Sequence, residues 1–295
     1  LFTDREIIDF KVGGWLQSKI ARIIAKRRSK KVASDYLKMG GASPQLPIAK
    51  RLFNKVSNFY FQKTGRELQV FFGMCYYHPY IEDTYSVLQK GDFERVIAIT
   101  LYPQYSYTTS GVCFGRFFNM FRRRPLGGKL ALIPVWHMDE GYNNCMIRNI
   151  FRAAERIGMD VKDCILMFSA HSLPQYTLKK GDIYVSHINS QIEHIVSRVQ
   201  PFRYVLCYQS KAGLMKWLEP PTDKTLYNLR HEKRPIVVVP ISFVSDHIET
   251  LIELDEIYIK NANLMGMDVV RMESLNDSDD FAHAMANIIS MGGSC

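Results

Sequence analysis

The sequence predicts an α/β fold made of two Rossmann-like, doubly wound domains with parallel sheets. Short apolar runs of five to seven residues recur along the chain, and stretches with helical spacing separate them. Runs that are apolar on both faces are typical of strands that helices cover on both sides. The length of 295 residues also suits two domains of about 100–200 residues each.

The candidate strands are rich in Val, Ile, Leu and Phe, which favour strands. In chain order they span residues 69–75, 95–101, 129–135, 163–169, 203–209 and 235–241, with a weaker candidate at 268–273. Helical spacing lies between them, for example from Met146 to Ile157. This alternation predicts βαβ units and a mainly parallel sheet in each domain.

Three of the candidate strands precede residue 150 and three follow it, which places the domain boundary near this residue. We therefore expect an N-terminal domain at 1–150, a C-terminal domain at 151–277, and a helix within 278–295 that packs back on either domain. No low-complexity linker marks the boundary.

Composition excludes several classes of protein. The hydrophobic fraction of 47% and charged fraction of 23% are ordinary for a globular chain and exclude disorder and coiled coil. No run reaches the roughly 18–20 apolar residues of a membrane span. The six cysteines form no C-x-x-C pair, which argues against a zinc ribbon or a compact disulfide framework and favours a reducing compartment. Since the sequence starts at Leu1, any targeting peptide would lie upstream.

Residues suited to chemistry gather directly after the predicted strands. Because the carboxyl ends of parallel strands share one edge of a sheet, we expect these segments to converge on a cleft. They span residues 73–79, 102–106, 169–174, 208–213 and 242–249. No G-x-G-x-x-G or Walker sequence is present, so nothing positive indicates nucleotide binding.

His171 ends the fourth predicted strand, between small residues and a Ser-Leu-Pro turn. It could be an ordinary turn histidine bonded to backbone. As a neutral imidazole it could instead accept a proton or bind a metal near neutral pH. A hydrolase triad has little support, because the chain has no G-x-S-x-G sequence.

Asp246 and Glu249 have the spacing of a capping box that opens a helix. Glu249, Glu253 and Glu256 also fall at i, i+4 and i+7, which places them on one face of an α-helix. Stacked like charges repel, so this stripe is either fully solvated or a conduit for protons or cations.

The net charge of +9 is compatible with nucleic acid, an anionic membrane or an acidic substrate. Seven basic residues fall between Lys19 and Lys31, after an apolar segment at 7–16 that contains Trp15. A solvated helix face is one interpretation. Apolar anchors beside a basic helix favour a membrane surface, and no motif of a nucleic-acid-binding fold appears.

Taken together, these segments resemble the ferrochelatase family, whose members insert Fe²⁺ into protoporphyrin IX in the last step of haem synthesis. The resemblance runs from Leu1 to Asn276. Six motifs carry it in order, at 24–28, 40–44, 102–106, 168–174, 209–218 and 245–251.

The resemblance implies a class II chelatase-like fold with the porphyrin in the cleft between two domains. It implies that His171 and Glu249 are catalytic and meet the metal, and that a lip at about 6–28 docks on a membrane. A proton or metal path would continue through Asp246, His247, Glu253 and Glu256. Porphyrin-binding residues would be Arg27, Arg28, Tyr36, Ser43, Cys75, Tyr102 and Trp217.

The sequence departs from the family pattern at three places. Cys75 stands where members usually carry an arginine, and the Gly-Gly-Pro strand that opens the domain is absent before Leu1. Tyr107 stands where animal enzymes carry a cysteine of a [2Fe–2S] cluster. We therefore expect no such cluster and no tightly bound cofactor, since Fe²⁺ is a substrate.

We expect an active ferrochelatase, a lyase, that uses protoporphyrin IX and Fe²⁺. The alternative is a catalytically impaired homologue that binds porphyrin or haem as a carrier or sensor. The expected partners include an anionic membrane and a second copy in a homodimer, and exclude nucleic acid. The expected location is the matrix face of the mitochondrial inner membrane in a eukaryote, or the cytoplasm in association with a membrane in a bacterium.

Overall fold

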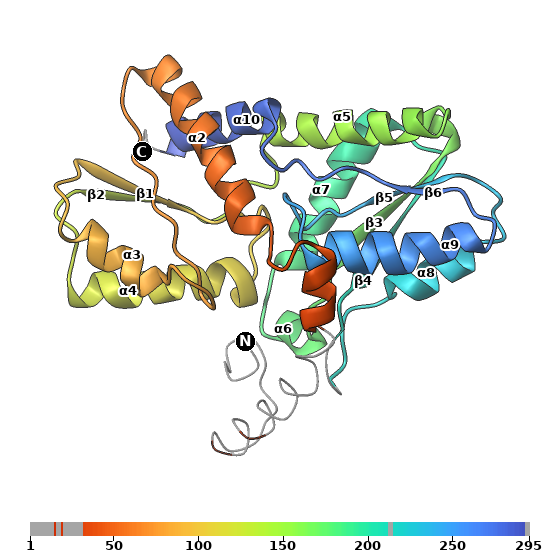
Figure 1. Cartoon of the computed structure of the whole chain (residues 1–295), viewed down its shortest axis with the longest axis horizontal. Coiled ribbons are helices and arrows are strands. Elements are labelled where there is room, and N and C mark those ends of the chain that lie inside the picture. Colours follow the sequence, from red (N-terminus) through yellow and green to blue (C-terminus); the bar gives the residue numbers. More distant parts are fainter. Residues whose placement is uncertain (1–14, 16–18, 20–31, 212–214, 293–295) are drawn as a thin grey trace.

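The computed structural model describes Trp15, Lys19, and residues 32–211 and 215–292 (Figure 1). It has an α/β fold with two parallel sheets, which confirms the predicted fold class. The strands are β1 Arg95–Ile99, β2 Lys129–Ile133, β3 Ile165–His171, β4 Arg203–Gln209, β5 Ile236–Val239 and β6 Val269–Arg271. The helices are α2 Gln45–Thr64, α3 Ile81–Leu88, η1 Tyr107–Gly111, α4 Val112–Arg123, α5 Glu140–Arg156, η2 Val161–Asp163, α6 Gln175–Lys179, α7 Tyr184–Val199, α8 Thr222–Leu229, η3 Glu249–Ile259, α9 Lys260–Leu264 and α10 Asp279–Gly292.

The N-terminal half contains the pair β1 and β2, which run parallel with Arg95 opposite Lys129 and Ile99 opposite Ile133. Helices α3 and α4 lie below this pair in Figure 1, and α2 and α10 lie above it. The two strands therefore have helices on both sides, which agrees with the apolar residues that follow Arg95 and Lys129.

The prediction of a strand at 69–75 is wrong. Within the described residues, this segment makes one isolated bridge, between Met74 and Tyr80, and no ladder. A strand needs a hydrogen-bonded neighbour along its length, and here residues 66–77 and 92–102 face each other across a cavity that both line. An apolar sequence indicates that both faces of a segment are buried. It does not indicate whether another strand lies beside the segment to form a ladder of hydrogen bonds.

The C-terminal half contains a fully parallel sheet in the order β4-β3-β5-β6. On the central strand β3, Leu166 and Phe168 contribute to the core with α5 and α7, whereas Ile165 and Met167 contribute to the core with α8 and η3. All four side chains are fully buried. This alternation explains why β3 is apolar without interruption.

The predicted boundary at residue 150 falls inside α5 and has to be moved. Helix α5 is continuous and is capped by Asp139, whose carboxylate accepts a hydrogen bond of 2.8 Å from the backbone N–H of Tyr142. Its buried face packs against α7, β5 and β6, so the whole helix belongs with the C-terminal sheet. The buried face of α5 runs without a break from Tyr142 to Ala154, so the domain boundary cannot lie at residue 150, although equal numbers of predicted strands lie on either side of it.

Helix α10 connects the two halves, because it packs on α2, β2 and α5. Its side chains share one buried cluster with residues of α2, α5, β3 and α7. One shared core therefore lies against both sheets, in addition to the core that each sheet has with its other helices.

Phe281→Ala should reveal the energy stored in this common core. Phe281 is fully buried, and its ring lies 6.2 Å from the rings of both Trp136 and Tyr142. Removing a buried phenylalanine costs about 3–5 kcal/mol of unfolding free energy, which urea denaturation would measure. Phe61→Ala is the matched control, because Phe61 is 52% exposed and should cost less than about 1 kcal/mol. Equal losses in the two variants would contradict the role assigned to α10.

Candidate active site

The backbone of His171 is fixed at the carboxyl end of β3. Its N–H donates to Ser242 Oγ at 2.9 Å, and its carbonyl oxygen accepts from the Tyr184 hydroxyl at 3.2 Å. Tyr184 and Ser242 also share a hydrogen bond of 2.7 Å. Since Ser242 follows β5, the neighbour of β3 in the sheet, parallel pairing brings both residues to the same edge.

His171 and Glu249 form a close pair, with His171 Nδ1 2.8 Å from Glu249 Oε2. The two side chains are 33% and 23% exposed, so the pair can be reached from solvent. His247 lies behind it, with Nε2 3.9 Å from the same carboxylate oxygen and Nδ1 3.1 Å from the carbonyl of Ser245. Two histidines therefore face one carboxylate.

Each member of the pair favours the charged form of the other. Burial lowers the pKa of His171, but the charge and hydrogen bond of Glu249 outweigh it, and the pKa is raised above its ordinary value. Burial acts to raise the pKa of Glu249, but His171 and His247 overcome it and hold that pKa well below its usual range. The pairing therefore favours an imidazolium at His171 and a carboxylate at Glu249.

Asp246 and Glu249 do not form the predicted capping box. The N–H of Asp246 donates to Asn276 Oδ1 at 2.8 Å, while Glu249 is bound to His171. Thr250 Oγ1 instead accepts from the N–H of His247 at 3.0 Å. The capping box is absent because the backbone N–H of Asp246 bonds to Asn276, which is 30 positions away in the sequence, and not to Glu249.

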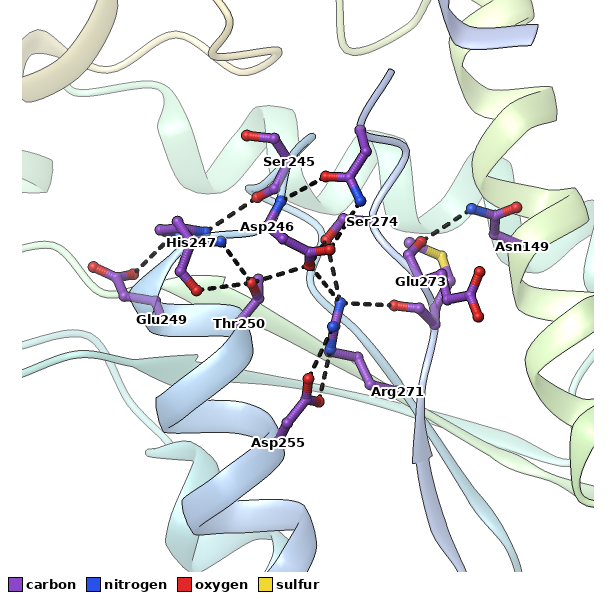
Figure 2. Close-up of polar contacts among 12 residues, drawn as sticks. Asn149, Ser245, Asp246, His247, Glu249, Thr250, Asp255, Arg271, Glu273 and Ser274 are labelled. Atoms are coloured by element: carbon purple, nitrogen blue, oxygen red, sulfur yellow. Dashed lines mark hydrogen bonds and ion pairs between the residues drawn. The ribbon is translucent and has the colours of Figure 1, made fainter. Parts of the chain in front are cut away.

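The carboxylate of Asp246 belongs to a polar cluster between η3 and β6 (Figure 2). It accepts hydrogen bonds from Ser274 at 2.7 Å and Asn276 at 2.8 Å, and lies 3.2 Å from Arg271 Nη1. Burial acts to raise its pKa, but Arg271 and these hydrogen bonds overcome it and lower the pKa. Arg271 also forms a bidentate pair with Asp255, at 2.8 and 2.9 Å. Asp246 thus anchors the start of η3 to β6 and to the segment that follows β6.

The predicted acidic stripe is interrupted after Glu253. The Glu253 carboxylate accepts hydrogen bonds from Ser210, through its N–H at 3.0 Å and its hydroxyl at 2.5 Å, and from Tyr258 at 2.8 Å. Glu256 is half exposed and pairs with Lys260 at 3.1 Å. Placing Glu256 on the same face was wrong, because η3 is a π-helix. Its i→i+5 bonding adds a residue to each turn, so residues seven apart no longer share a face.

A cavity of about 1020 Å³ lies next to this pair. It is lined by residues 66–77, β1, α3, α4 and the loop Ser242–Ser245, and it contains Cys75 and Tyr102 of the predicted site. It therefore lies mostly in the N-terminal half and meets the C-terminal half at this loop. Phe243 spans the junction, because it lines the cavity and packs edge-to-face on His171 at 6.1 Å.

The remaining predicted residues lie outside the His171–Glu249 pair. Tyr36 is half-buried in a helical segment at 32–38, and Ser43 lies just before α2 with its hydroxyl 3.4 Å from Gln45. Trp217 bridges to Pro174, close after His171. Arg27, Arg28 and most of the lip at 6–28 lie outside the described residues.

Two further positions were singled out by the sequence. Trp15 is 72% exposed, and the Lys19 ammonium lies 3.8 Å above its ring. Tyr107 begins η1, where its N–H donates to the carboxylate of Asp182 at 2.9 Å. Among the described residues, no group of three or more His, Cys, Asp or Glu side chains has the geometry to hold a metal ion.

Sequence reasoning missed Tyr184, Tyr258 and Arg271. Ser210 lies in the segment 208–213 that was expected at the cleft, but its bond to Glu253 was not predicted. Tyr184 contacts His171 and Arg271 contacts Asp246 only because the fold brings distant segments together. Nothing in the sequence around either residue indicates these contacts.

Glu249→Gln should lower the pKa of His171, because burial would still lower it and only the weaker influence of Glu253 would remain to raise it. An NMR titration of the histidine Cε1–H resonances would measure the change, with His171 assigned from the spectrum of His171→Ala. Glu256→Gln is the control on the same helix and should leave the His171 pKa unaltered. A shift of similar size in both variants would refute the specific pairing.

The pair should also stabilise the fold within a defined pH window. The raised pKa of His171 gives stability that is complete below 6.5 and is lost as pH rises through the folded value. The depressed pKa of Glu249 gives stability that is present above 4.5 and is lost as pH falls toward its folded value. The difference in unfolding free energy between wild type and Glu249→Gln should therefore be largest between 4.5 and 6.5. Urea denaturation across pH would measure it, with exposed Glu155→Gln as the flat control.

Comparison with known proteins connects this geometry to a family. The ferrochelatase family model matches residues 1–292. The chain is 36% identical over 296 residues to the ferrochelatase of Geobacter sp. (strain M21), covering 98% of this chain and 90% of that protein. It is 37% identical over 298 residues to the ferrochelatase of Aquifex aeolicus (strain VF5), covering 98% and 91%.

Solved structures share the fold. SirB from Bacillus subtilis with Fe³⁺ has a TM-score of 0.54 and 12% identity, over 82% of this chain and 89% of that one. CbiX, the terminal enzyme for biosynthesis of sirohaem in denitrifying bacteria, has a TM-score of 0.53 and 14% identity, over 85% and 94%. At such identities the likeness concerns the fold alone. In the described part of the chain, no helix has the length and apolarity needed to cross a membrane. The match over nearly the whole length, with the curated relatives, shows that the chain belongs to the ferrochelatase family.

Proposed function

We propose that this protein is an active ferrochelatase of the lyase class, which inserts Fe²⁺ into protoporphyrin IX. The observation that carries the proposal is the His171–Glu249 pair, 2.8 Å apart, at the carboxyl end of a central parallel strand beside a cavity of about 1020 Å³. Metallation removes two pyrrole protons, so a base has to lie over the centre of the macrocycle. The pair supplies such a base at the edge of a space large enough for a ligand of this class.

His171 would meet the substrate through Nε2, since Nδ1 is bound to Glu249. As an imidazolium, His171 has to lose its proton before it can accept one. An approaching ferrous ion favours that loss, because a nearby positive charge lowers the pKa of a cationic acid. Glu249 keeps the ring oriented, and His247, 3.9 Å from the same carboxylate, is the next group that can take up the proton.

The porphyrin would be held by groups on both sides of the pair. Tyr102 and Cys75 line the cavity, and Phe243 forms its wall next to His171. We assign the propionates to Arg27 and Arg28, because cationic forks bind carboxylates strongly. Ser43 and Tyr36 would add hydroxyl donors, and Trp217 would form a wall of the pocket. Glu253 would extend the proton path, with Ser210 and Tyr258 holding its carboxylate in place by hydrogen bonds.

We also propose that the protein binds the surface of an anionic membrane through the segment 6–31. An apolar segment followed by seven basic residues suits a lipid surface, and the relatives compared above are bacterial, which favours the cytoplasmic face of a bacterial membrane. Sedimentation with vesicles of phosphatidylglycerol, compared with phosphatidylcholine, tests this contact. Analytical ultracentrifugation, which measures the mass of the particle in solution, would test the expectation that two copies of the chain form a homodimer.

The direct test is an anaerobic assay with protoporphyrin IX and Fe²⁺, followed as loss of porphyrin fluorescence. His171→Ala should lower the rate by about 100-fold or more, the typical effect of removing a general base. His231→Ala is the matched control, because His231 is exposed and precedes the amino end of β5, at the edge of the sheet opposite to His171, and its rate should equal that of wild type.

Two outcomes would overturn the proposal. Full activity in His171→Ala would remove the assigned base. Tight porphyrin binding by wild type without turnover would favour the alternative of a porphyrin or haem carrier.

A further inference from the structure

Two thiols lie in contact in the wall of the cavity. Cys75 Sγ and Cys113 Sγ are 3.5 Å apart, although the residues are 38 positions apart in the sequence. Cys75 lies in the segment that follows Gly73, and Cys113 lies in the first turn of α4. A disulfide has an S–S bond of about 2.05 Å, so the two sulfur atoms have to approach by only about 1.5 Å, within the reach of side-chain rotation.

Access distinguishes this pair from the other cysteines of the described chain. Cys75 and Cys113 are half-buried and line the cavity. Cys145, Cys164 and Cys207 are at most 3% exposed. A small reagent that enters the cavity therefore reaches the pair and does not reach the three buried thiols.

The electrostatic surroundings set the conditions for reaction. The hydrogen bond with Cys75 and burial raise the pKa of the Cys113 thiol, while the nearby Arg116 guanidinium opposes them. Arg116 also donates to the carbonyl oxygen of Cys75 at 2.8 Å, which ties the two chain segments together. Since the thiolate is the nucleophile, the reaction should be slow at neutral pH and faster in alkaline buffer.

We propose that Cys75 and Cys113 are a reversible dithiol–disulfide pair in the cavity wall, oxidised by exchange with a low-molecular-weight disulfide. One protein thiolate attacks a sulfur atom of the small disulfide, which forms a mixed disulfide and releases one small thiolate. The second protein thiolate then attacks the protein sulfur of the mixed disulfide and releases the other small thiolate. The two protein thiols are oxidised, the small disulfide is reduced, and both thiol protons end on the two small thiols.

The bond would join two walls of the cavity. The segment 66–77 would be tethered to α4, whose Phe114 and Phe117 also line the space. Tyr102 lines the same space, where burial and, to a lesser extent, the neighbouring Cys113, Cys75 and Glu249 raise the pKa of its hydroxyl. We infer that the oxidised form admits a large planar ligand less readily. This second step rests on the proposed function, whereas the disulfide itself does not.

The first experiment maps the bond in the purified full-length chain. The protein is incubated with glutathione disulfide at pH 8.5, alkylated and digested with trypsin without reduction. Trypsin releases Cys75 within 67–90 and Cys113 within 96–116, and neither peptide has another cysteine. The expected product is one linked peptide with the summed mass of both less two hydrogens.

Variants make this result specific. The linked peptide should disappear in Cys75→Ser and in Cys113→Ser, and should persist in the control Cys145→Ser. Far-ultraviolet circular dichroism checks that each variant folds. Unlinked thiols, or two separate glutathione adducts, in oxidised wild type would overturn the proposal without relying on any variant.

The second experiment measures binding of protoporphyrin IX by quenching of protein fluorescence. Oxidised wild type should bind at least five times more weakly than reduced wild type, and dithiothreitol should restore the binding. In Cys113→Ser, the affinity should be the same with and without glutathione disulfide. Equal affinities of the oxidised and reduced wild type would overturn the effect on the cavity. If the reduced protein also failed to bind porphyrin, that result would count against the proposed function. The peptide map would still show whether Cys75 and Cys113 form a disulfide.

Discussion

The position of the site depends on the parallel pairing of β3 with β5. The register from Ile165–Ile236 to Phe168–Val239 makes both strands end at the same edge, so His171 and Ser242 meet there. The chain then enters η3 directly, which brings Glu249 within 2.8 Å of His171. A shift of one residue in this register would exchange the two faces of β3, and it would turn the imidazole away from the carboxylate.

Two partly buried charge clusters hold η3 in place. Glu249 pairs with His171 at the first residue of the helix, and Asp255 pairs with Arg271 of β6 farther along it. Asp246, just before the helix, contacts the same arginine. Because a buried charge that loses its partner is costly, these pairs support each other. The geometry of the acid–base pair is therefore maintained by an arginine that does not touch it.

The sequence predicted the features that follow from local pattern. The strands near 95–99, 129–133, 165–171 and 203–209 are visible as continuous apolar runs, and His171 stands out at the end of one of them. Features that depend on distant partners could not be predicted. The segment 69–75 has the composition of a strand but no neighbour, and Asp246 looks like a cap but bonds to Asn276. Glu256 was misplaced because a π-helix cannot be distinguished from an α-helix by apolar spacing.

The position of α10 in the chain has a consequence for biosynthesis. Helix α2 emerges early from the ribosome, yet its apolar face, including Leu52 and Val56, is covered in part by α10, which emerges late. Vectorial folding, in which an N-terminal domain completes its core before the next is made, is therefore closed to this chain. This face of α2 therefore stays partly uncovered until residues 279–292 have left the ribosome, by which time the whole C-terminal sheet has been synthesised.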